Sequence, residues 1–568
     1  MWCCNKIITD NNTHFLIFCN SWLNWICQYI FHCKIYQFKN ILMSNTNDPI
    51  VQTNTCAISG NEFSITQWDL DFYNKISPTF AGQKFQIPTP TLSPDERQKR
   101  RLAFRNERNL YRRTCDASGK QIISIYSPDK PYKVYDQKIW WSDSRDGLDY
   151  GRAFDFGKTF TEQFGELMSE VPHLPLINDD GRASTNCAFT NDFALWKNCY
   201  MCFHMWDGEN DMYCYFCNWS NNLFDCNIVT WWASYSYECI IWSNLYNCKY
   251  LIKSLDCSDC SYWVLLQWCT FCFGCVWLTN ASYCIQNKQY SKEEYFAKVK
   301  ELESRAYMEK FFATSAVKEA ISRPFIMNSE NSSWDNLINC QNSIWTNLFN
   351  CQWVKFTDGS DRLVNCHDLF SVWKSELCYY WITPDNGYQV HFSVYSWHCK
   401  NAFYTMNCHN SSDLFGCIWL RNKQYCIFNK QYTKEQYEKT VAQIITHMQE
   451  TWEWGEFFDP SLSPFWYNET VAQEYYPSTK TEITQNGYKR SDYEVPTPVS
   501  DKVIQGQDLP ESVEEVQDDI LHFAIACEVT GKLFRLQPQE LVFYRKHNIP
   551  VPRKHPDQRH LERLALRK

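Results

Sequence analysis

The sequence predicts a mainly β fold with additional helices, in which two cysteine-ladder β-solenoid blocks are flanked by small α+β modules. Three observations predict it: cysteines recur at regular spacings, one segment occurs twice, and a Cys-x-x-[Ser/Thr]-Gly unit occurs near both ends. Internal repeats of this kind indicate a solenoid, because each repeat buries its apolar face against its neighbours. We therefore expect coils resembling those of a parallel β-helix.

Most of the 30 cysteines lie in residues 187–290 and 340–432, and nearly all spacings in the first block are 3, 9 or 12. Separations of 21 recur, as between Cys239 and Cys260. Short β-prone runs alternate with Asn, Ser and Asp, which favour turns. We predict coils of about 20 residues, with cysteines stacked inward and asparagines at the corners, where they tolerate left-handed backbone.

Metal binding is the alternative interpretation of the cysteines. Two groups have C-x2-C pairs at zinc-ligand spacing. Their members are Cys199, Cys202, Cys214 and Cys217, and then Cys257, Cys260, Cys269 and Cys272. Because the regular spacing continues through cysteines outside these pairs, the pattern favours a structural ladder. No cofactor is expected on this interpretation, and zinc is the cofactor of the alternative. Disulfides are the third interpretation.

The duplicated segment comprises residues 272–295 and 414–437. The first copy reads C-F-G-C-V-W-L-T-N-A-S-Y-C-I-Q-N-K-Q-Y-S-K-E-E-Y, and the second reads L-F-G-C-I-W-L-R-N-K-Q-Y-C-I-F-N-K-Q-Y-T-K-E-Q-Y. In both, N-K-Q-Y is followed by a Ser/Thr-x-x-Glu/Gln capping signal. We predict that each copy is the last coil of a block, followed by a helix that covers the open sheet edge.

Related modules stand near the two ends. Cys56-x-x-Ser59-Gly60 matches Cys527-x-x-Thr530-Gly531, and residues 115–120 repeat the unit as C-D-A-S-G-K. This is the spacing of a zinc knuckle in which a hydroxyl replaces the second thiolate. We predict zinc-ribbon-like modules that lack full metal ligands and are held by apolar packing.

Ser93-Pro94-Asp95-Glu96 predicts a helix start. The helix that follows, over 97–113, is expected to carry the arginines Arg97, Arg100, Arg101, Arg105, Arg108 and Arg112. Several of them lie at i, i+4 spacing and so share one face. Such a face suits a nucleic-acid-associated protein. The other interpretation is a solvated face that pairs with acidic surface elsewhere.

The net charge of −9 argues against binding of polyanions by the chain as a whole. Nucleophile–base pairs, metal motifs and phosphate loops do not occur in their required context, so we predict no catalytic residues and no enzymatic activity. The stretch 15–41 is interrupted by polar residues and lacks a basic leader. We expect a cytoplasmic protein with reduced thiols, no membrane partner, and a protein or glycan ligand.

The predicted organisation has nine parts. They are a non-native extension (1–42, with Met43 as the true start), a ribbon-like module with the basic helix (43–114), a second ribbon-like module and helix (115–186), solenoid block 1 (187–290), a helical insert (291–339), solenoid block 2 (340–432), a capping helix (433–454), a linker and acidic helix (455–526), and a repeat of the first module whose end we expect to be truncated (527–568).

Several phrases are specific enough to compare with known families. They include L-A-F-R-N-E-R-N-L-Y-R-R at 102–113, I-I-S-I-Y-S-P-D-K-P-Y-K-V-Y at 122–135, P-S-L-S-P-F at 460–465 and H-P-D-Q-R-H at 555–560. The chain resembles a family of Cys-repeat, degenerate zinc-ribbon proteins from candidate-phylum bacteria with small genomes. The family has no agreed activity, so the resemblance implies no function. Zinc binding does not carry over, because Ser59 and Ser118 replace cysteines that some relatives have.

Tryptophan is unexpectedly frequent, with 25 Trp against 17 Gly, whereas glycine usually makes up about 7% of residues. Our hypothesis is that UGA codons read as glycine in the source organism have been translated as Trp. The positions concerned are Trp277, Trp419, Trp452 and Trp466. In the family that the chain resembles, the first two positions are typically Gly.

Overall fold

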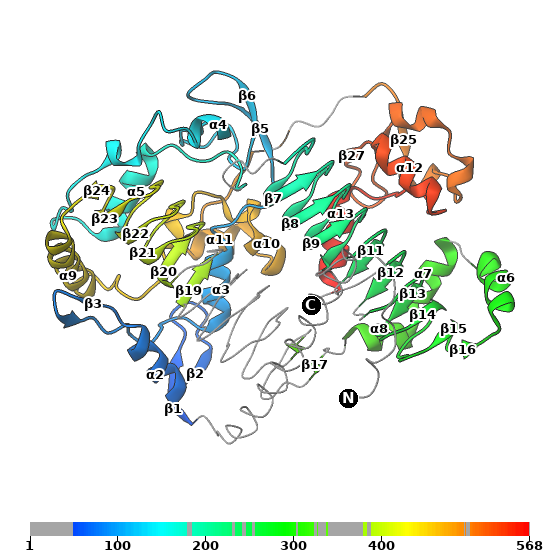
Figure 1. Cartoon of the computed structure of the whole chain (residues 1–568), viewed down its shortest axis with the longest axis horizontal. Helices are drawn as coiled ribbons and strands as arrows, with labels where there is room; N and C mark the ends of the chain where they lie inside the picture. The colour runs from blue at the N-terminus through cyan, green and yellow to red at the C-terminus, as the bar shows by residue number, and fades with distance from the viewer. Residues whose placement is uncertain are drawn as a thin grey trace, which may run out of the picture. The chain divides into compact units, whose positions relative to one another are not determined.

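Two rows of stacked strands form a β-solenoid of about 13 turns in the computed structural model (Figure 1). The structure describes residues 49–566 except 179–183, 230–232, 241–245, 253–255, 303–304, 323–325, 328–336, 339–378, 383–387, 494 and 496–499. The contacts given below lie within the unit formed by Thr55–Phe63 and Phe72–Lys568. The predicted β-solenoid with additional helices is confirmed, whereas the predicted extension 1–42 lies outside the described residues.

Block 1 contains ten strands that follow one another in chain order. They are β7 (Asn191–Lys197), β8 (Phe203–Glu209), β9 (Tyr215–Asn221), β10 (Asn227–Val229), β11 (Tyr237–Ile240), β12 (Lys249–Ile252), β13 (Ser261–Val264), β14 (Thr270–Phe273), β15 (Ser282–Ile285) and β16 (Lys288–Gln289). The first nine pair in parallel, with Asn191 beside Phe203 and Cys272 beside Cys284. This register gives coils of twelve residues. The step from Asn227 to Ile240 contains one residue more.

The coil length of twelve differs from the predicted length of about 20, and the backbone explains why. Every third residue is left-handed, as at Asn198, Met201, His204 and Asp207, so each coil has four corners. A left-handed conformation costs about 1–2 kcal/mol for a residue other than glycine. Backbone hydrogen bonds between coils offset this cost, for example the bond from Asn210 N to the Lys197 carbonyl at 2.9 Å. The recurring separation of 21 residues therefore corresponds to one coil of twelve residues plus three further sides of three residues each.

The core of block 1 is lined by thiols. Each cysteine of the block directly follows a left-handed corner residue, which turns its side chain inward. Cys214 Sγ donates to the carbonyl of Leu223 at 3.2 Å, and Cys217 Sγ to that of Cys226 at 3.5 Å. The cysteines share the interior with other inward side chains, among them the larger Trp196 and Trp263. The inward cysteine ladder is confirmed, whereas the corners also hold residues other than asparagine.

Block 2 repeats this architecture. Its described strands are β19 (Tyr379–Ile382), β20 (Tyr388–Val394), β21 (Lys400–Phe403), β22 (Ser412–Phe415), β23 (Gln424–Ile427) and β24 (Lys430–Gln431). Leu414 lies beside Cys426, which again gives a coil of twelve residues. The rest of the predicted block, 340–378, lies outside the described residues, as do 383–387.

Both blocks end in the same way, as the duplicated segment predicts. β16 and β24 return antiparallel to the last coil. The Asn of each N-K-Q-Y closes the exposed edge: the Asn287 carboxamide accepts from Val276 N at 2.9 Å and donates to its carbonyl at 2.7 Å. Asn429 makes the same pair of bonds with Ile418 at 2.8 and 2.7 Å. One side chain thus replaces the strand that would come next.

A helix then follows each block. α6 (Lys292–Leu302) begins after Ser291, whose hydroxyl accepts from Glu294 N, and α9 (Lys434–Glu450) begins with a complete capping box at Thr433. α7 (Arg305–Ala313) and α8 (Ser315–Ser322) continue the helical insert, and the short strands β17 (Ile326–Met327) and β18 (Leu337–Ile338) follow them.

The flanking modules contain shorter elements. These are β1 (Ile50–Thr55), β2 (Glu62–Thr66), α2 (Gln67–Ile76), β3 (Thr79–Phe80), β4 (Gln83–Lys84), α3 (Pro94–Leu102), β5 (Tyr111–Thr114), β6 (Gln121–Ser124), α4 (Gln137–Trp140), η1 (Gly147–Tyr150) and α5 (Phe160–Glu170). At the C-terminal end they are β25 (Val503–Gln505), η4 (Gly506–Asp508), η5 (Val513–Glu515), η6 (Asp518–His522), β26 (Ala524–Ala526), β27 (Leu533–Phe534), α12 (Pro538–Lys546) and α13 (Pro556–Ala565).

The Cys-x-x-[Ser/Thr]-Gly unit forms the same turn in all three modules. Gly60 N donates to the Cys56 carbonyl, Gly119 N to that of Cys115, and Gly531 N to that of Cys527, at 2.8–3.0 Å. The three glycines have φ values near +70°, where other residues are strained. The three modules therefore share one turn, and Ser59, Ser118 and Thr530 stand where the predicted zinc knuckle would have its second ligand.

Residues 455–526, predicted to be a linker and an acidic helix, contain short packed elements. They are η2 (Pro460–Leu462), η3 (Tyr467–Glu469), α10 (Val471–Tyr475) and α11 (Lys480–Gln485), followed by β25 to β26. Tyr467 and Ala472 are buried in a cluster that also contains Leu102 of α3. Aromatic packing against the first module therefore orders this part of the chain.

Candidate functional site: buried ion clusters and an open solenoid side

The eight cysteines considered as zinc ligands lie inside the core of block 1. All of them are buried, and most of their thiols donate to main-chain carbonyls, as Cys199 Sγ does to Lys197 O at 3.3 Å. Burial raises the pKa of Cys202 and of Cys214 well above the usual value, which disfavours the thiolate that zinc requires. Among the described residues, the group of three potential ligands that converges consists of Glu107, Asp192 and His204 instead.

That group surrounds a guanidinium. Arg105 Nη2 lies 2.5 Å from Glu107 Oε1, 3.0 Å from His204 Nδ1, and in direct contact with Asp192 Oδ2. Burial opposes the charge of Arg105, but Glu107 and Asp192 raise its pKa overall. One nitrogen of Arg105 thus touches all three groups and occupies the place that a metal ion would take. The site therefore already holds a cation, the guanidinium of Arg105.

Arg105 also links the two blocks. Asp192 and His204 are corner residues of block 1, whereas Tyr395, whose ring lies 5.6 Å from the guanidinium carbon, is a corner residue of block 2. Arg105 and Tyr395 are both buried. Removing one partner from such a cluster leaves an uncompensated buried charge, which typically costs about 3–5 kcal/mol. The cluster is therefore a strong internal joint.

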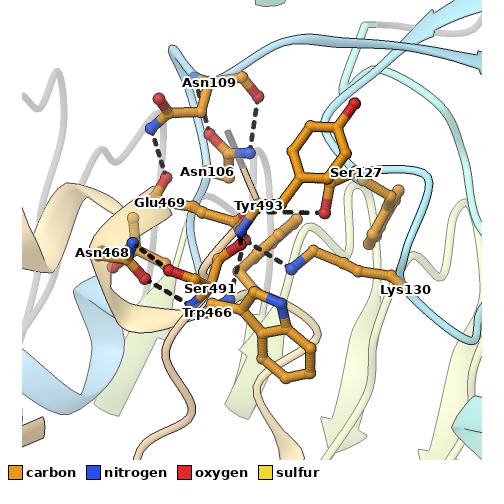
Figure 2. A network of polar contacts seen from close by, with 12 residues as sticks. Asn106, Asn109, Ser127, Lys130, Trp466, Asn468, Glu469, Ser491 and Tyr493 are labelled. Atoms are coloured by element: carbon orange, nitrogen blue, oxygen red, sulfur yellow. Dashed lines mark hydrogen bonds and ion pairs between the residues drawn. The ribbon is translucent and has the colours of Figure 1, made fainter. Parts of the chain in front are cut away.

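A second buried cluster centres on Glu469, and Figure 2 shows it from close by. Lys130 Nζ lies 2.5 Å from Glu469 Oε2, and Tyr111 donates to Oε1 at 2.8 Å. Asn109 donates to the Glu469 carbonyl at 2.9 Å. The ammonium of Lys130 also lies 4.0 Å from the ring centre of Trp466. Segments more than 300 residues apart in sequence are joined here.

The groups of this cluster bind one another and thereby hold distant segments of the chain together. Burial lowers the pKa of Lys130, although the attraction of Glu469 opposes that shift. Glu469 accepts through its carboxylate from four donors: besides Lys130 and Tyr111, these are Ser127 Oγ at 3.4 Å and Trp466 N at 3.1 Å. Its carboxylate is thus saturated by groups of the chain itself. Proton transfer to an outside reactant would require this cluster to open.

The C-terminal module docks on block 1 through a third cluster. Arg559 contacts Asp225, Arg563 Nη1 lies 3.0 Å from the other oxygen of Asp225, and Phe543 stacks on Phe224 with ring centres 3.7 Å apart. Asp225 is a fully buried corner residue. Acidic corners of the solenoid therefore accept arginines from both terminal modules.

The six arginines predicted on one helix do not form a basic surface. α3 ends at Leu102, so Arg105 and Arg108 lie in the following loop and Arg112 lies on β5. Arg97, Arg101 and Arg105 are buried. Arg100 pairs with Glu456 at 3.8 Å, and Arg108 with Asp557 at 3.3 Å. Of the six, Arg112 is exposed.

The sides of block 1 differ in exposure. Most outward residues of one side are buried against other elements, namely Met212, Phe224, Tyr237, Phe273 and Ile285, whereas Lys249 and Ser261 on the same side are half-buried. Another side carries what we call the polar strip: Lys197, Glu209, Asn221, Ser234, Tyr246, Ser258, Thr270 and Ser282. None of its members is buried, and Tyr246 is 54% exposed. The polar strip is thus a solvent-accessible side of block 1.

The sequence did not reveal Lys130, Glu469, Asp192 or Asp225 as cluster residues. The available signal was indirect: the specific phrases at residues 102–113, 122–135 and 555–560 supply many of the side chains in the three clusters.

Comparisons with protein-family models, curated proteins and solved structures give no match. Within the described ranges, no helix is both long enough and apolar enough to cross a membrane.

Proposed function

We propose that this chain is a non-enzymatic binding or scaffold protein that presents the polar strip of block 1 to a protein or glycan ligand. The observation that carries the proposal is the contrast between the sides of block 1, since the apolar side is covered by the rest of the chain and the polar strip is open. Solenoids commonly bind ligands along such extended regular surfaces.

The chemistry of the polar strip favours a ligand with many hydrogen-bonding groups. Thr270 and Ser282 lie 2.8 Å apart through their hydroxyls, and Lys197 is neutralised by Glu209 at 2.7 Å. Strand spacing places successive members about 4.8 Å apart along the block. A regular array of hydroxyls and amides with little net charge matches hydroxyl- or amide-rich chains better than phosphate backbones, which need cationic partners.

Nucleic-acid association receives less support. Three of the six arginines predicted to bind nucleic acid are buried, and Arg100 and Arg108 pair with carboxylates of the chain itself. The interpretation of these arginines as a face that pairs with acidic groups elsewhere agrees better with these contacts.

The test is affinity capture from the source organism with the full chain as bait, with and without nuclease. We expect a partner that survives nuclease treatment. The double variant Tyr246→Ala, Ser258→Arg should reduce its recovery by at least about tenfold, because it disrupts two neighbouring members of an open surface. Glu435→Arg, on the exposed face of α9, is the matched control and should retain the partner.

Two results would contradict the proposal. Capture that disappears with nuclease would indicate nucleic-acid association. Equal recovery with both variants would exclude the polar strip as the binding surface.

A further inference from the structure

The first coil of block 1 contains a thiol pair with unusual exposure. Cys187 is half-buried, whereas the other cysteines of the described residues are buried. Its neighbour in the next coil is Cys199, because the bridges from Thr185 to Lys197 and from Ala188 to Tyr200 enclose both cysteines. Cys187 and Cys199 are thus stacked at the beginning of the solenoid.

The geometry allows a direct bond between these two sulfurs. Paired strands lie about 4.7–4.9 Å apart, and disulfides join Cα atoms about 4.4–6.8 Å apart. The two thiols make equivalent contacts, because Cys187 Sγ donates to Thr185 O at 3.4 Å and Cys199 Sγ donates to Lys197 O at 3.3 Å. Asn186 Nδ2 donates to Asn198 Oδ1 at 2.9 Å directly before them, which keeps the two corners aligned. Little backbone movement is needed.

The reactivities of the two thiols differ in a useful way. The neighbouring Cys199 thiol lowers the pKa of Cys187 to about 7, although burial opposes this effect. Burial raises the pKa of Cys199. An accessible thiolate reacts first with oxidants, and a neighbouring thiol then resolves the product.

We propose that Cys187 and Cys199 are an oxidation site at which hydrogen peroxide forms a disulfide joining the first two coils. The Cys187 thiolate attacks one peroxide oxygen, which breaks the O–O bond and gives a sulfenic acid and hydroxide. The sulfur of Cys199 then attacks the sulfenic sulfur, the S–S bond forms, and the hydroxyl leaves as water with the Cys199 proton. The two thiols together supply the two electrons that reduce peroxide to water, and a dithiol reverses the step.

The pair lies at the boundary between a reactive surface and an inert core. Next along the ladder of Cys199 stands Asp211 rather than a cysteine, so exchange cannot continue along that ladder. Cys202 is fully buried on the next side of the coil, and burial raises its pKa. The modification should therefore stop at one disulfide and should leave the ladder reduced.

In the test, the reduced full chain is treated with increasing concentrations of hydrogen peroxide and is then denatured in the presence of N-ethylmaleimide, which blocks the remaining thiols. The protein is digested with chymotrypsin, and the peptides are identified by mass spectrometry. Cleavage after Tyr200 separates Cys199 from Cys202. We expect a linked Cys187–Cys199 peptide that dithiothreitol releases, formed at least about tenfold faster than modification of Cys202 or Cys214.

Variants distinguish the roles. Cys187→Ser should abolish the linked peptide, Cys199→Ser should leave a Cys187 sulfenic acid that dimedone captures, and Cys202→Ser should form the link normally. Circular dichroism confirms that each variant is folded, and Cys187→Ala serves as a second variant at the half-exposed position. The proposal is overturned if Cys187 stays unmodified while core thiols react, or if another pair links first.

Discussion

Replacing Asp211 with asparagine should remove a pH dependence from the stability of block 1. Asp211 is fully buried in the thiol core, and burial raises its pKa to about 7 although Leu223 N and Ser220 Oγ donate to it at 2.6 and 2.9 Å. A raised pKa means that the folded state binds a proton that the unfolded state has released. The stabilisation is therefore complete below pH 3.8 and is lost as the pH rises to about 7.

The magnitude follows from the size of the shift. A change from 3.8 to about 7 corresponds to about 4 kcal/mol at about 1.4 kcal/mol per pKa unit. Wild-type block 1 should lose this amount between pH 4 and pH 8, and the Asp211→Asn variant should not. The asparagine can keep both hydrogen bonds, because its oxygen accepts from Leu223 N and the Ser220 hydroxyl can turn to accept.

The assay is native-state hydrogen exchange on peptides that cover residues 203–226, corrected for the intrinsic pH dependence of exchange. A local measurement is needed because a chain with several blocks does not unfold in one step. Asp207→Asn is the control, since Asp207 is an exposed corner residue of the same coil and should leave the wild-type pH dependence unchanged. An equal decline in wild type and Asp211→Asn would refute the reasoning.

Three other substitutions test the Glu469 cluster, the end of α9 and the closure of block 2 by Asn429. Glu469→Gln should lower the stability measured by thermal unfolding by about 3 kcal/mol, because it leaves the Lys130 ammonium buried without its counter-charge. Adding Lys130→Met should recover part of that stability. If stability does not recover, the unpaired charge is not the cause of the loss. Trp452→Gly should stabilise the folded protein by about 1 kcal/mol, because Trp452 has φ +61° directly after the α9 cap and is 90% exposed. Trp454→Gly should destabilise the folded protein, because it removes a buried ring. Equal effects of the two substitutions on stability would contradict this reasoning. Asn429→Ala should cost about 3 kcal/mol through three lost hydrogen bonds, two to Ile418 and one to Gly147 O. It should also speed hydrogen exchange at Ile418 N, and unchanged exchange there would exclude the end-closing role.

The hypothesis of recoded glycines stays a prediction. Trp277 and Trp419 have positive φ, but solenoid corners accept many residue types, so their conformation does not discriminate. Trp452 is more informative because it occupies the C′ position of a helix, where glycine is usual. Trp466 has φ −83° and packs on Lys130. A UGG codon at Trp452 would contradict the hypothesis for that position.

Much of the solenoid could be predicted, because cysteine spacing reports directly on the direction of side chains. The inward ladder and the ends at Asn287 and Asn429 follow from local patterns. The coil length does not, because Met201, Tyr213 and Trp219 adopt left-handed backbone that their residue types do not favour. Contacts between coils, which involve residues twelve or thirteen positions apart, impose this conformation.

The clusters could not be predicted, because they depend on partners far apart in the sequence. The spacing of Arg97, Arg101 and Arg105 is compatible with a solvated helix face and gives no sign that Asp192 will bury beside Arg105. Lys130 and Glu469 likewise carry no local signal of pairing. Burial of charge is decided by tertiary packing, which periodicity does not contain.

The closure of each block by one asparagine has a consequence for how such a chain can change over time. Because the closing bonds of Asn287 and Asn429 go to Val276 and Ile418, whole twelve-residue coils can be inserted or deleted upstream without altering those bonds. Each insertion would lengthen the block by about 4.8 Å and keep the sides aligned, whereas an insertion of any length not divisible by three would turn the inward side chains outward. The length of the solenoid is therefore adjustable in fixed steps, independently of its ends.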